Sequence, residues 1–177
     1  MKKFSTKELV YLALLISLNI VLTRIASIRL TIGGVEGIRI GFGGFPTILA
    51  GIIFGPVSGG IVGAIGDIVG YSINPAGPYM PHFTLTAALT GIIPALVIMP
   101  FKKGIPGFWL LLFAIATGEI ITSAILVPYF LQMLFNIPML VSLPAKIISL
   151  VIQIPIYAFF GELILKRINF ILNLNPR

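Results

Sequence analysis

Long apolar segments alternate with short polar or Gly/Pro-rich stretches along almost the whole chain. A helix rises about 1.5 Å per residue, so about 20 apolar residues are needed to cross the hydrocarbon core of a bilayer. The pattern predicts an all-α membrane protein, a compact bundle of six transmembrane helices forming one domain over residues 1–177. The expected helices are residues 7–28, 45–54, 57–73, 83–99, 108–135 and 140–167.

The second of these segments is short, and it is expected to need neighbours or flanking turns to complete its crossing. Gly- and Pro-rich composition predicts loops between the helices, because these residues break regular structure. The loop from Leu30 to Gly44 is expected to have some extended character. Two further loops are expected, Asn74 to His82 and Asn136 to Val141.

Composition agrees with a membrane protein and excludes several other classes. Hydrophobic residues make up 58% of the chain and charged residues 10%, with a mean hydropathy of +1.10, whereas soluble domains are about 45–50% apolar and about 25% charged. The absence of Cys excludes disulfides and thiolate metal sites. The net charge of +7 does not indicate nucleic-acid binding, because the bases flank apolar spans rather than form one stripe.

The first apolar segment also has some features of a signal peptide, with two lysines directly after Met1. However, the run from Leu9 to Leu22 is followed by Arg24 and has no clear small-x-small cleavage site. We therefore expect this segment to be retained as the first helix.

Most of the basic residues predict the orientation of the bundle. Six crossings would place both termini and the loop after the fourth helix on one side. Cytoplasmic loops of membrane proteins are enriched in Lys and Arg, so this side is expected to be cytoplasmic. The eight bases concerned are Lys2, Lys3, Lys7, Lys102, Lys103, Lys166, Arg167 and Arg177.

A second group of charges does not follow this rule. The remaining bases, Arg24, Arg29, Arg39 and Lys146, fall near the opposite, outer ends of the segments, and Asp67 and Glu119 fall inside apolar segments. An ionisable side chain at membrane depth costs at least about 2.5–3.5 kcal/mol, so it indicates a functional site. Two interpretations remain open: the acids pair with Arg24 and Lys146 to hold the bundle together, or the group lines an outward-facing pocket for an organic ligand.

Helical spacing places polar residues of three segments on common faces. One face carries Asp67, Gly70, Tyr71 and Asn74, and another carries Lys146, Ser149, Gln153 and Tyr157. A shorter stripe consists of Glu119, Thr122 and Ser123. Three helices are therefore expected to offer polar faces to a common interior.

Catalytic motifs are missing from the sequence. No His-Glu-x-x-His occurs, and the single His82 cannot build a metal site in a chain without Cys. The Gly-rich stretch Gly41 to Gly44 lacks the Lys-Ser/Thr that completes a phosphate-binding loop. Active transport would therefore take its energy from a partner protein or from an ion gradient.

Four motifs in the first half of the chain carry a family resemblance. They are Arg39-Ile-Gly-Phe-Gly-Gly-Phe-Pro-Thr47, Phe54-Gly-Pro-Val-Ser-Gly-Gly60, Gly66-Asp67-Ile-Val-Gly70 and Pro81-His-Phe-Thr-Leu-Thr86. With these motifs the chain resembles the S components of energy-coupling factor (ECF) vitamin transporters, most closely the folate-specific branch. S components are the substrate-binding subunits of these ABC importers.

The resemblance implies a six-helix subunit in the plasma membrane of a bacterium that captures its vitamin outside the cell. Its implied partners are a transmembrane coupling (T) subunit and two cytoplasmic ATPase subunits, which use the ATP. The chain itself would be no enzyme and would need no cofactor. The small residues Ala13 and Ser17 on the first helix would contact the coupling subunit, and the loop from Leu30 to Gly44 would act as a gate.

Folate would also suit the inferred charges, since its glutamate tail is a dianion and its ring offers hydrogen-bond donors. Asp67 or Glu119 is expected to accept from the ring, and Arg24, Arg39 or Lys146 to hold the tail. Tyr79, His82 and Phe83 are expected to stack on the ring or contact its edge. The full set of expected contacts is Arg24, Arg39, Asp67, Tyr71, Tyr79, His82, Phe83, Glu119, Lys146 and Gln153.

Three alternatives stay open at this stage. The first is an S component for another vitamin, such as pantothenate, riboflavin or a queuosine precursor. The second is a small membrane enzyme that uses Asp67 and Glu119 as an acid/base pair, although no matched nucleophile or metal motif accompanies them. The third is an ion-coupled carrier, which an inverted repeat would favour, and no convincing repeat is present.

Overall fold

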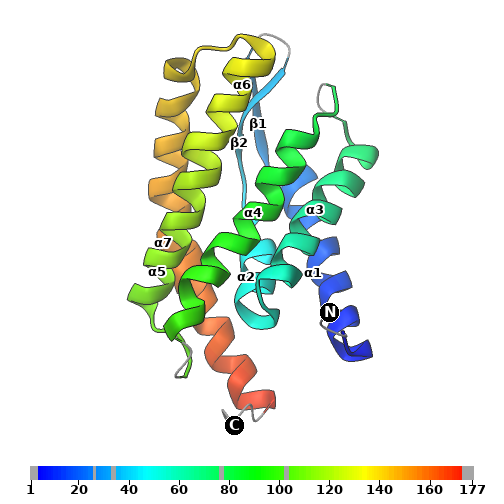
Figure 1. Ribbon diagram of the computed structural model, residues 1–177, viewed down its shortest axis with the longest axis vertical. Coiled ribbons are helices and arrows are strands. Elements are labelled where there is room, and N and C mark those ends of the chain that lie inside the picture. Colours follow the sequence, from blue (N-terminus) through cyan, green and yellow to red (C-terminus); the bar gives the residue numbers. More distant parts are fainter. Residues whose placement is uncertain (1–3, 26, 33–34, 76–77, 102–103, 173–177) are drawn as a thin grey trace.

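The structure, a computed structural model, is an elongated helical bundle with one β-hairpin (Figure 1). It describes residues 4–25, 27–32, 35–75, 78–101 and 104–172, with the backbone alone at 28–32, 35–40, 145 and 169–172. The elements in chain order are α1 (Thr6–Arg24), β1 (Ile28–Ile32), β2 (Val35–Ile40), α2 (Gly44–Phe54), α3 (Pro56–Ile73), α4 (Pro81–Ile98), η1 (Met99–Phe101), α5 (Phe108–Glu119), η2 (Ile120–Leu126), α6 (Val127–Phe135) and α7 (Met139–Leu172).

Within the described part of the chain, five helical segments are long and apolar enough to cross a membrane. They are Thr6–Arg24, Pro56–Ile73, Pro81–Phe101, Phe108–Phe135 and Met139–Ile168. The sixth, α2, has 11 residues and spans only about 16 Å. In Figure 1, β2 runs down into α2, so strand and short helix together make one passage along the bundle.

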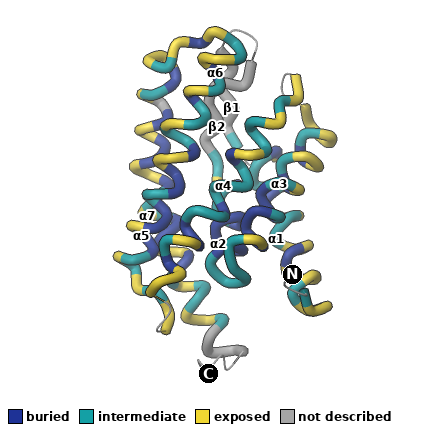
Figure 2. Tube along the Cα trace, in the orientation of Figure 1, coloured by how far each residue is buried: buried dark blue, intermediate teal, exposed yellow. Residues whose placement is uncertain are grey.

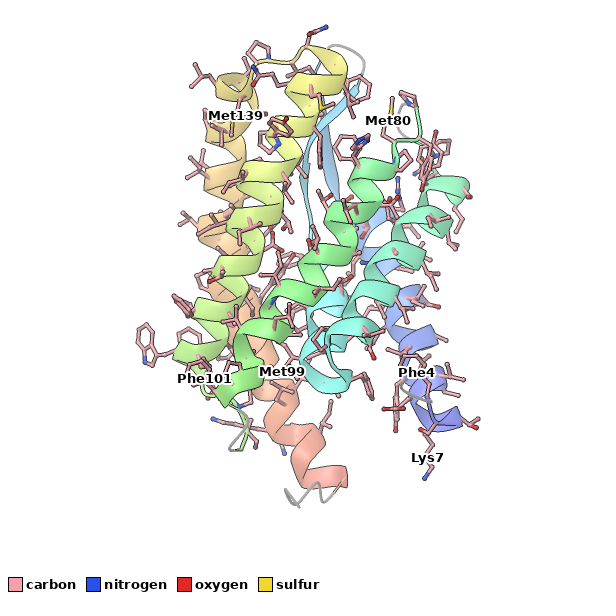
Figure 3. All side chains as sticks on the ribbon, in the orientation of Figure 1. Phe4, Lys7, Met80, Met99, Phe101 and Met139 are labelled. Atoms are coloured by element: carbon pink, nitrogen blue, oxygen red, sulfur yellow. The ribbon has the colours of Figure 1, made fainter. Side chains whose placement is uncertain are left out.

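This arrangement brings the two ends of the described chain together. The start of α1 and the last turns of α7 both lie at the lower end in Figure 1. Figure 3 labels Phe4, Lys7 and Phe101 at the same end, and Met80 and Met139 at the opposite, upper end. These two names, lower end and upper end, are kept below.

The β-hairpin replaces part of the expected first helix and of the expected loop. β1 and β2 are antiparallel, with Ile28 opposite Ile40 and an irregularity between Leu30 and Thr31. α1 ends at Arg24 rather than at residue 28, because the following residues pair as strands. Their β-branched side chains favour extended backbone, so the expected extended character is realised as a β-hairpin and the fold is not purely helical.

The segment expected as one helix over residues 108–135 contains a π-helical stretch, η2. π-helical turns insert residues into an α-helix and widen its hydrogen-bonding pattern to i→i+5. The sequence carries no periodic signal for this change. The interruption follows Glu119 directly, so it lies at one of the expected functional residues.

Glycines allow α2, α3 and α4 to pack with almost no space between their backbones. A Cβ atom on Gly63 would lie 2.1 Å from the carbonyl oxygen of Ala87, and one on Gly51 would lie 2.1 Å from that of Gly91. Such close approach replaces the hydrophobic drive that helices lack inside lipid. Buried residues gather around α2 in the lower half of the bundle (Figure 2), where Ile48 and Leu111 belong to the main apolar cluster.

Candidate functional site

A cavity of about 250 Å³ lies above α2, between the end of the hairpin and α1, α3, α4, η2 and α7. Its lining includes Pro78, Tyr79 and Met80 of the segment that precedes α4. Met80 is labelled at the upper end in Figure 3, so the cavity reaches that end of the bundle. At its inner limit it meets Gly44 and Thr47, in the first turn of α2.

One wall of the cavity carries an ion pair between α1 and α3. Arg24 Nη2 lies 3.3 Å from Asp67 Oδ1, and Arg24 Nη1 donates to the carbonyl of Asn74 at 3.1 Å. The second carboxylate oxygen, Asp67 Oδ2, accepts from Thr84 Oγ1 at 2.7 Å. Gly70 makes this possible, since a Cβ there would lie 2.9 Å from Arg24 Nε. The pairing of Asp67 with Arg24, one of the two interpretations that the sequence left open, is therefore present.

The turn between β2 and α2 is held by side chains from two opposite helices. From α1, Asn19 Nδ2 donates to the carbonyl of Gly43 at 2.7 Å and to Thr47 Oγ1 at 2.9 Å. From α7, Gln153 Nε2 and Tyr157 Oη both donate to the carbonyl of Gly41, at 3.1 and 3.0 Å. The lower end of the hairpin is thus fixed between α1 and α7, and its backbone lines the cavity.

The opposite wall is formed by the end of α5, η2 and α7 and is deeply buried. Glu119 is 4% exposed and Lys146 9%, and Lys146 acts electrostatically on the carboxylate. Glu119 Oε2 accepts from Ser123 Oγ at 2.8 Å. Thr122, one residue earlier, receives a hydrogen bond of 3.1 Å from Thr90 on α4, so η2 is tied to the neighbouring helix.

Aromatic rings surround the upper part of the cavity. Tyr71 and Tyr79 lie with ring centroids 5.2 Å apart, and Tyr79 also exchanges a hydrogen bond of 3.0 Å with Thr84. Both tyrosines and Phe83 line the cavity. His82 does not belong to this lining, because its ring packs 4.9 Å from Phe130 on α6 instead.

Eight of the ten expected contact residues line the cavity: Arg24, Asp67, Tyr71, Tyr79, Phe83, Glu119, Lys146 and Gln153. Arg39 lies in β2, and its side chain is outside the described residues. Ala13 and Ser17, the expected partner contacts, are exposed on α1. Ser17 Oγ donates to the carbonyl of Ala13 at 3.0 Å.

Sequence reasoning missed several neutral members of the site. Asn19, Thr47, Thr86 and Thr90 line the cavity, but single neutral polar residues in apolar segments give only a weak signal. Asn19 is 8% exposed and lies four residues before Thr23, which also lines the cavity, so the two share a helical face. Two neutral polar residues at this spacing were the one available indication. Among the described residues, no group of three or more His, Cys, Asp or Glu is arranged to hold a metal ion.

Comparison with known proteins gives a consistent result. A family described as "ECF-type riboflavin transporter, S component" matches residues 3–169. The folate transporter FolT of Clostridium novyi (strain NT) is 34% identical over 158 residues, which cover 89% of this chain and 86% of the relative. FolT of Leuconostoc mesenteroides subsp. mesenteroides is 28% identical over 134 residues, covering 76% and 68%.

Two solved structures are also similar. A crystal structure of FolT bound with folic acid superposes with a TM-score of 0.77 at 26% identity, over 93% of this chain and 97% of that one. A structure of the S component of a bacterial ECF transporter superposes with a TM-score of 0.61 at 19% identity, over 94% and 97%. The second likeness concerns the fold alone.

Proposed function

The chain belongs to the S components of energy-coupling factor (ECF) transporters, and we propose that it is the membrane subunit that captures folate for such a transporter. Membership in this family confirms the resemblance found in the motifs. The ligand itself is proposed from the similarity of the chain to folate transporters and from the chemistry of the cavity.

The observation that carries the proposal is a cavity with charged groups of both signs on facing walls. Arg24 and Asp67 lie on one wall, and Lys146 and Glu119 on the other. Folate combines a dianionic glutamate tail with a pterin ring whose N–H groups donate hydrogen bonds. Cations suit the tail, and carboxylate or hydroxyl oxygens suit the ring.

The size of the cavity is compatible with partial enclosure of such a ligand. Sites for drug-sized molecules measure about 300–1,000 Å³, and the cavity here is slightly smaller, at about 250 Å³. The aromatic groups Tyr71, Tyr79 and Phe83 near the upper end supply flat surfaces for a ring system. We propose that all eight lining residues named above, together with Arg39, contact the ligand or position the groups that do.

Transport would depend on partner subunits. We propose a transmembrane coupling subunit and two cytoplasmic ATPases as partners, because the sequence carries no phosphate-binding loop of its own. The exposed pair Ala13 and Ser17 on α1 offers a small-residue surface suited to close helix packing with the coupling subunit. The chain would thus bind the vitamin and contribute no catalysis.

We further propose that the chain lies in the plasma membrane of a bacterium with both termini in the cytoplasm. Lys7 is labelled at the lower end in Figure 3, and the last turns of α7, the helix that carries Lys166, lie at the same end in Figure 1, as expected for a cytoplasmic face. The cavity reaches the upper end, which would then face the outside and the vitamin.

Riboflavin is the second candidate, because the matching family is described as a riboflavin transporter component. It is uncharged, and its ring system bears one N–H between two carbonyl groups. A neutral ligand of this kind leaves the cations Arg24 and Lys146 without a charged counterpart on the ligand. Folate is therefore favoured by the charges of the site.

The test is to purify the protein in detergent and identify the co-purified small molecule by mass spectrometry. Titration calorimetry with folate and with riboflavin then ranks the two ligands for the emptied protein. We expect folate to co-purify and to bind more tightly. Riboflavin in the purified protein, with no heat signal from folate, would replace the proposal by the second candidate.

A further inference from the structure

The two buried carboxylates of the cavity differ in how many of their oxygens are already used. Asp67 has both oxygens engaged, Oδ1 by Arg24 and Oδ2 by Thr84. Among the described residues, Glu119 receives a side-chain hydrogen bond from Ser123 alone, on Oε2. Asp67 is thus satisfied by the protein itself, while Glu119 keeps an oxygen available.

The available oxygen, Glu119 Oε1, points to the inner part of the cavity. It lies 3.2 Å from the position that a Cβ atom on Gly44 would occupy, and both residues line the cavity. Glu119 is only 4% exposed. An oxygen at the wall of a cavity can accept from a ligand, and a hydrogen bond to a charged acceptor is stronger than one between neutral groups, so the arrangement suits a ligand that brings donors with it.

The wall around Glu119 is built to hold the carboxylate in one place. Ser123 lies four residues further along the same helical segment and donates to it at 2.8 Å. Thr122 donates to the carbonyl of Gly118 at 2.9 Å and is bonded to Thr90 on α4. The orientation of Glu119 is therefore set by η2 before any ligand arrives, and a preorganised group discriminates between ligands more sharply.

We infer that Glu119 is the specificity-determining carboxylate of the site and that Asp67 makes no direct ligand contact. This inference rests on the proposed function, because it concerns the ring that folate would place there. The pterin ring carries an N–H and an exocyclic NH₂ group side by side on one edge. A carboxylate accepts from such a pair with both oxygens or with one, and the hydrogen bonds are charge-assisted.

The role of Asp67 is then to position Arg24. Their ion pair, together with the hydrogen bond from Arg24 to the carbonyl of Asn74, ties the end of α1 to α3. Loss of Asp67 changes the shape of that wall for any ligand. Loss of Glu119 removes the acceptor for one particular group of the ligand. The two variants are therefore expected to differ in how their affinity depends on that group.

The experiment measures the binding of folate and of its 2-desamino analogue, in which hydrogen replaces the exocyclic amine. Calorimetry on the full chain in detergent compares wild type, Glu119→Gln and Asp67→Asn. We expect Glu119→Gln to weaken folate binding about 10- to 100-fold, as for loss of hydrogen bonds to a charged group. Binding of the analogue is expected to weaken far less. Asp67→Asn is expected to weaken both ligands by the same factor.

Glu162→Gln serves as the matched control, because Glu162 pairs with Lys166 and does not line the cavity. A variant that fails to fold is replaced by Glu119→Asp, which keeps the charge and withdraws the oxygens by one methylene. Equal loss of both ligands in the Glu119 variant would overturn the inference while leaving folate as the ligand. Absence of folate binding to wild type would overturn the proposed function as well.

Discussion

The hydroxyl of Tyr157 on α7 donates a hydrogen bond of 3.0 Å to the backbone carbonyl of Gly41, 116 residues earlier in the chain. The Tyr157 side chain is 2% exposed and also belongs to the main apolar cluster. It packs against Phe45 of α2, with ring centroids 5.5 Å apart. One side chain thus links the packed lower half of the bundle to the backbone that lines the cavity.

Tyr157→Phe is predicted to loosen the turn between β2 and α2 without changing the apolar packing. Gln153 still donates to the same carbonyl, so the expected loss of stability is about 0.5–1.5 kcal/mol, the net value of one hydrogen bond. The free energy of ligand binding is expected to become less favourable by a similar amount. Thermal unfolding in detergent and folate calorimetry measure both quantities. Tyr129→Phe, at an exposed position on α6, is the control and is expected to change neither.

The ion pair between Arg24 and Asp67 is predicted to show strong coupling in a double-mutant cycle. Removing Asp67 alone leaves the Arg24 charge in a site where only 3% of its side chain is exposed. Breaking such a pair costs about 3–5 kcal/mol, whereas replacing both partners by apolar residues costs much less. Arg24→Met with Asp67→Leu is therefore expected to be more stable than Asp67→Leu alone. Strictly additive losses in unfolding measurements would contradict this prediction.

The glycine contacts between α3 and α4 are predicted to tolerate no additional atom. A Cβ on Gly63 would lie 2.1 Å from the carbonyl oxygen of Ala87, so Gly63→Ala must push the helices apart. Overpacking of this kind costs about 1–3 kcal/mol. Gly107→Ala is the matched control, because no atom lies within 4 Å of the added carbon. The two variants are compared by thermal unfolding, and equal stability would show that the helices adjust freely.

Glu119→Gln is also predicted to reduce the preference for folate over riboflavin. The flavin edge presents an N–H beside a carbonyl group, and a carboxylate oxygen facing that carbonyl repels it. A glutamine amide offers one acceptor and one donor, which match the N–H and the carbonyl. Competition of riboflavin against folate is expected to require less riboflavin in the variant than in wild type. An unchanged ratio of the two affinities would count against a role for Glu119 in selectivity.

The proposed orientation predicts which positions are accessible from each side of the membrane. The natural sequence contains no Cys, so single cysteines can be introduced without removing others. A membrane-impermeant maleimide added to whole cells is expected to label Pro75→Cys, in the segment between α3 and α4. Lys7→Cys is expected to react only after permeabilisation. Labelling in the reverse order would invert the orientation.

Most of the candidate site could be predicted from the charged residues in apolar segments, because such residues are tolerated only where they face a polar interior. The helical faces through Asp67 and through Lys146 were correctly aligned, since regular helices turn residues four apart to the same side. The role of Tyr157 was less visible. Its helical face was predicted, but its partner is the backbone carbonyl of Gly41, in the turn after β2. A sequence does not show which backbone carbonyls accept hydrogen bonds from side chains.

Two features of the fold escaped sequence reasoning for different physical reasons. The hairpin was expected as a loop, because glycines at 33, 34 and 37 interrupt the alternation that marks a strand. The π-helical stretch after Glu119 involves residues that are equally acceptable in an α-helix, so its cause lies in tertiary contacts such as the bond between Thr90 and Thr122. The expected contact of His82 with the ligand stays a prediction, since its ring packs against Phe130 and is not part of the cavity lining.

The shortness of α2 has a consequence for how ligand specificity can change in such a protein. Hydrocarbon does not tolerate exposed strand edges, so a hairpin at this depth must be enclosed by protein or face water. The close contacts among Gly51, Gly59 and Gly91 lie outside the cavity lining, so the ligand would not meet them. Substitutions in the lining that retune recognition therefore leave this part of the helix packing intact, and one scaffold can serve chemically unrelated vitamins.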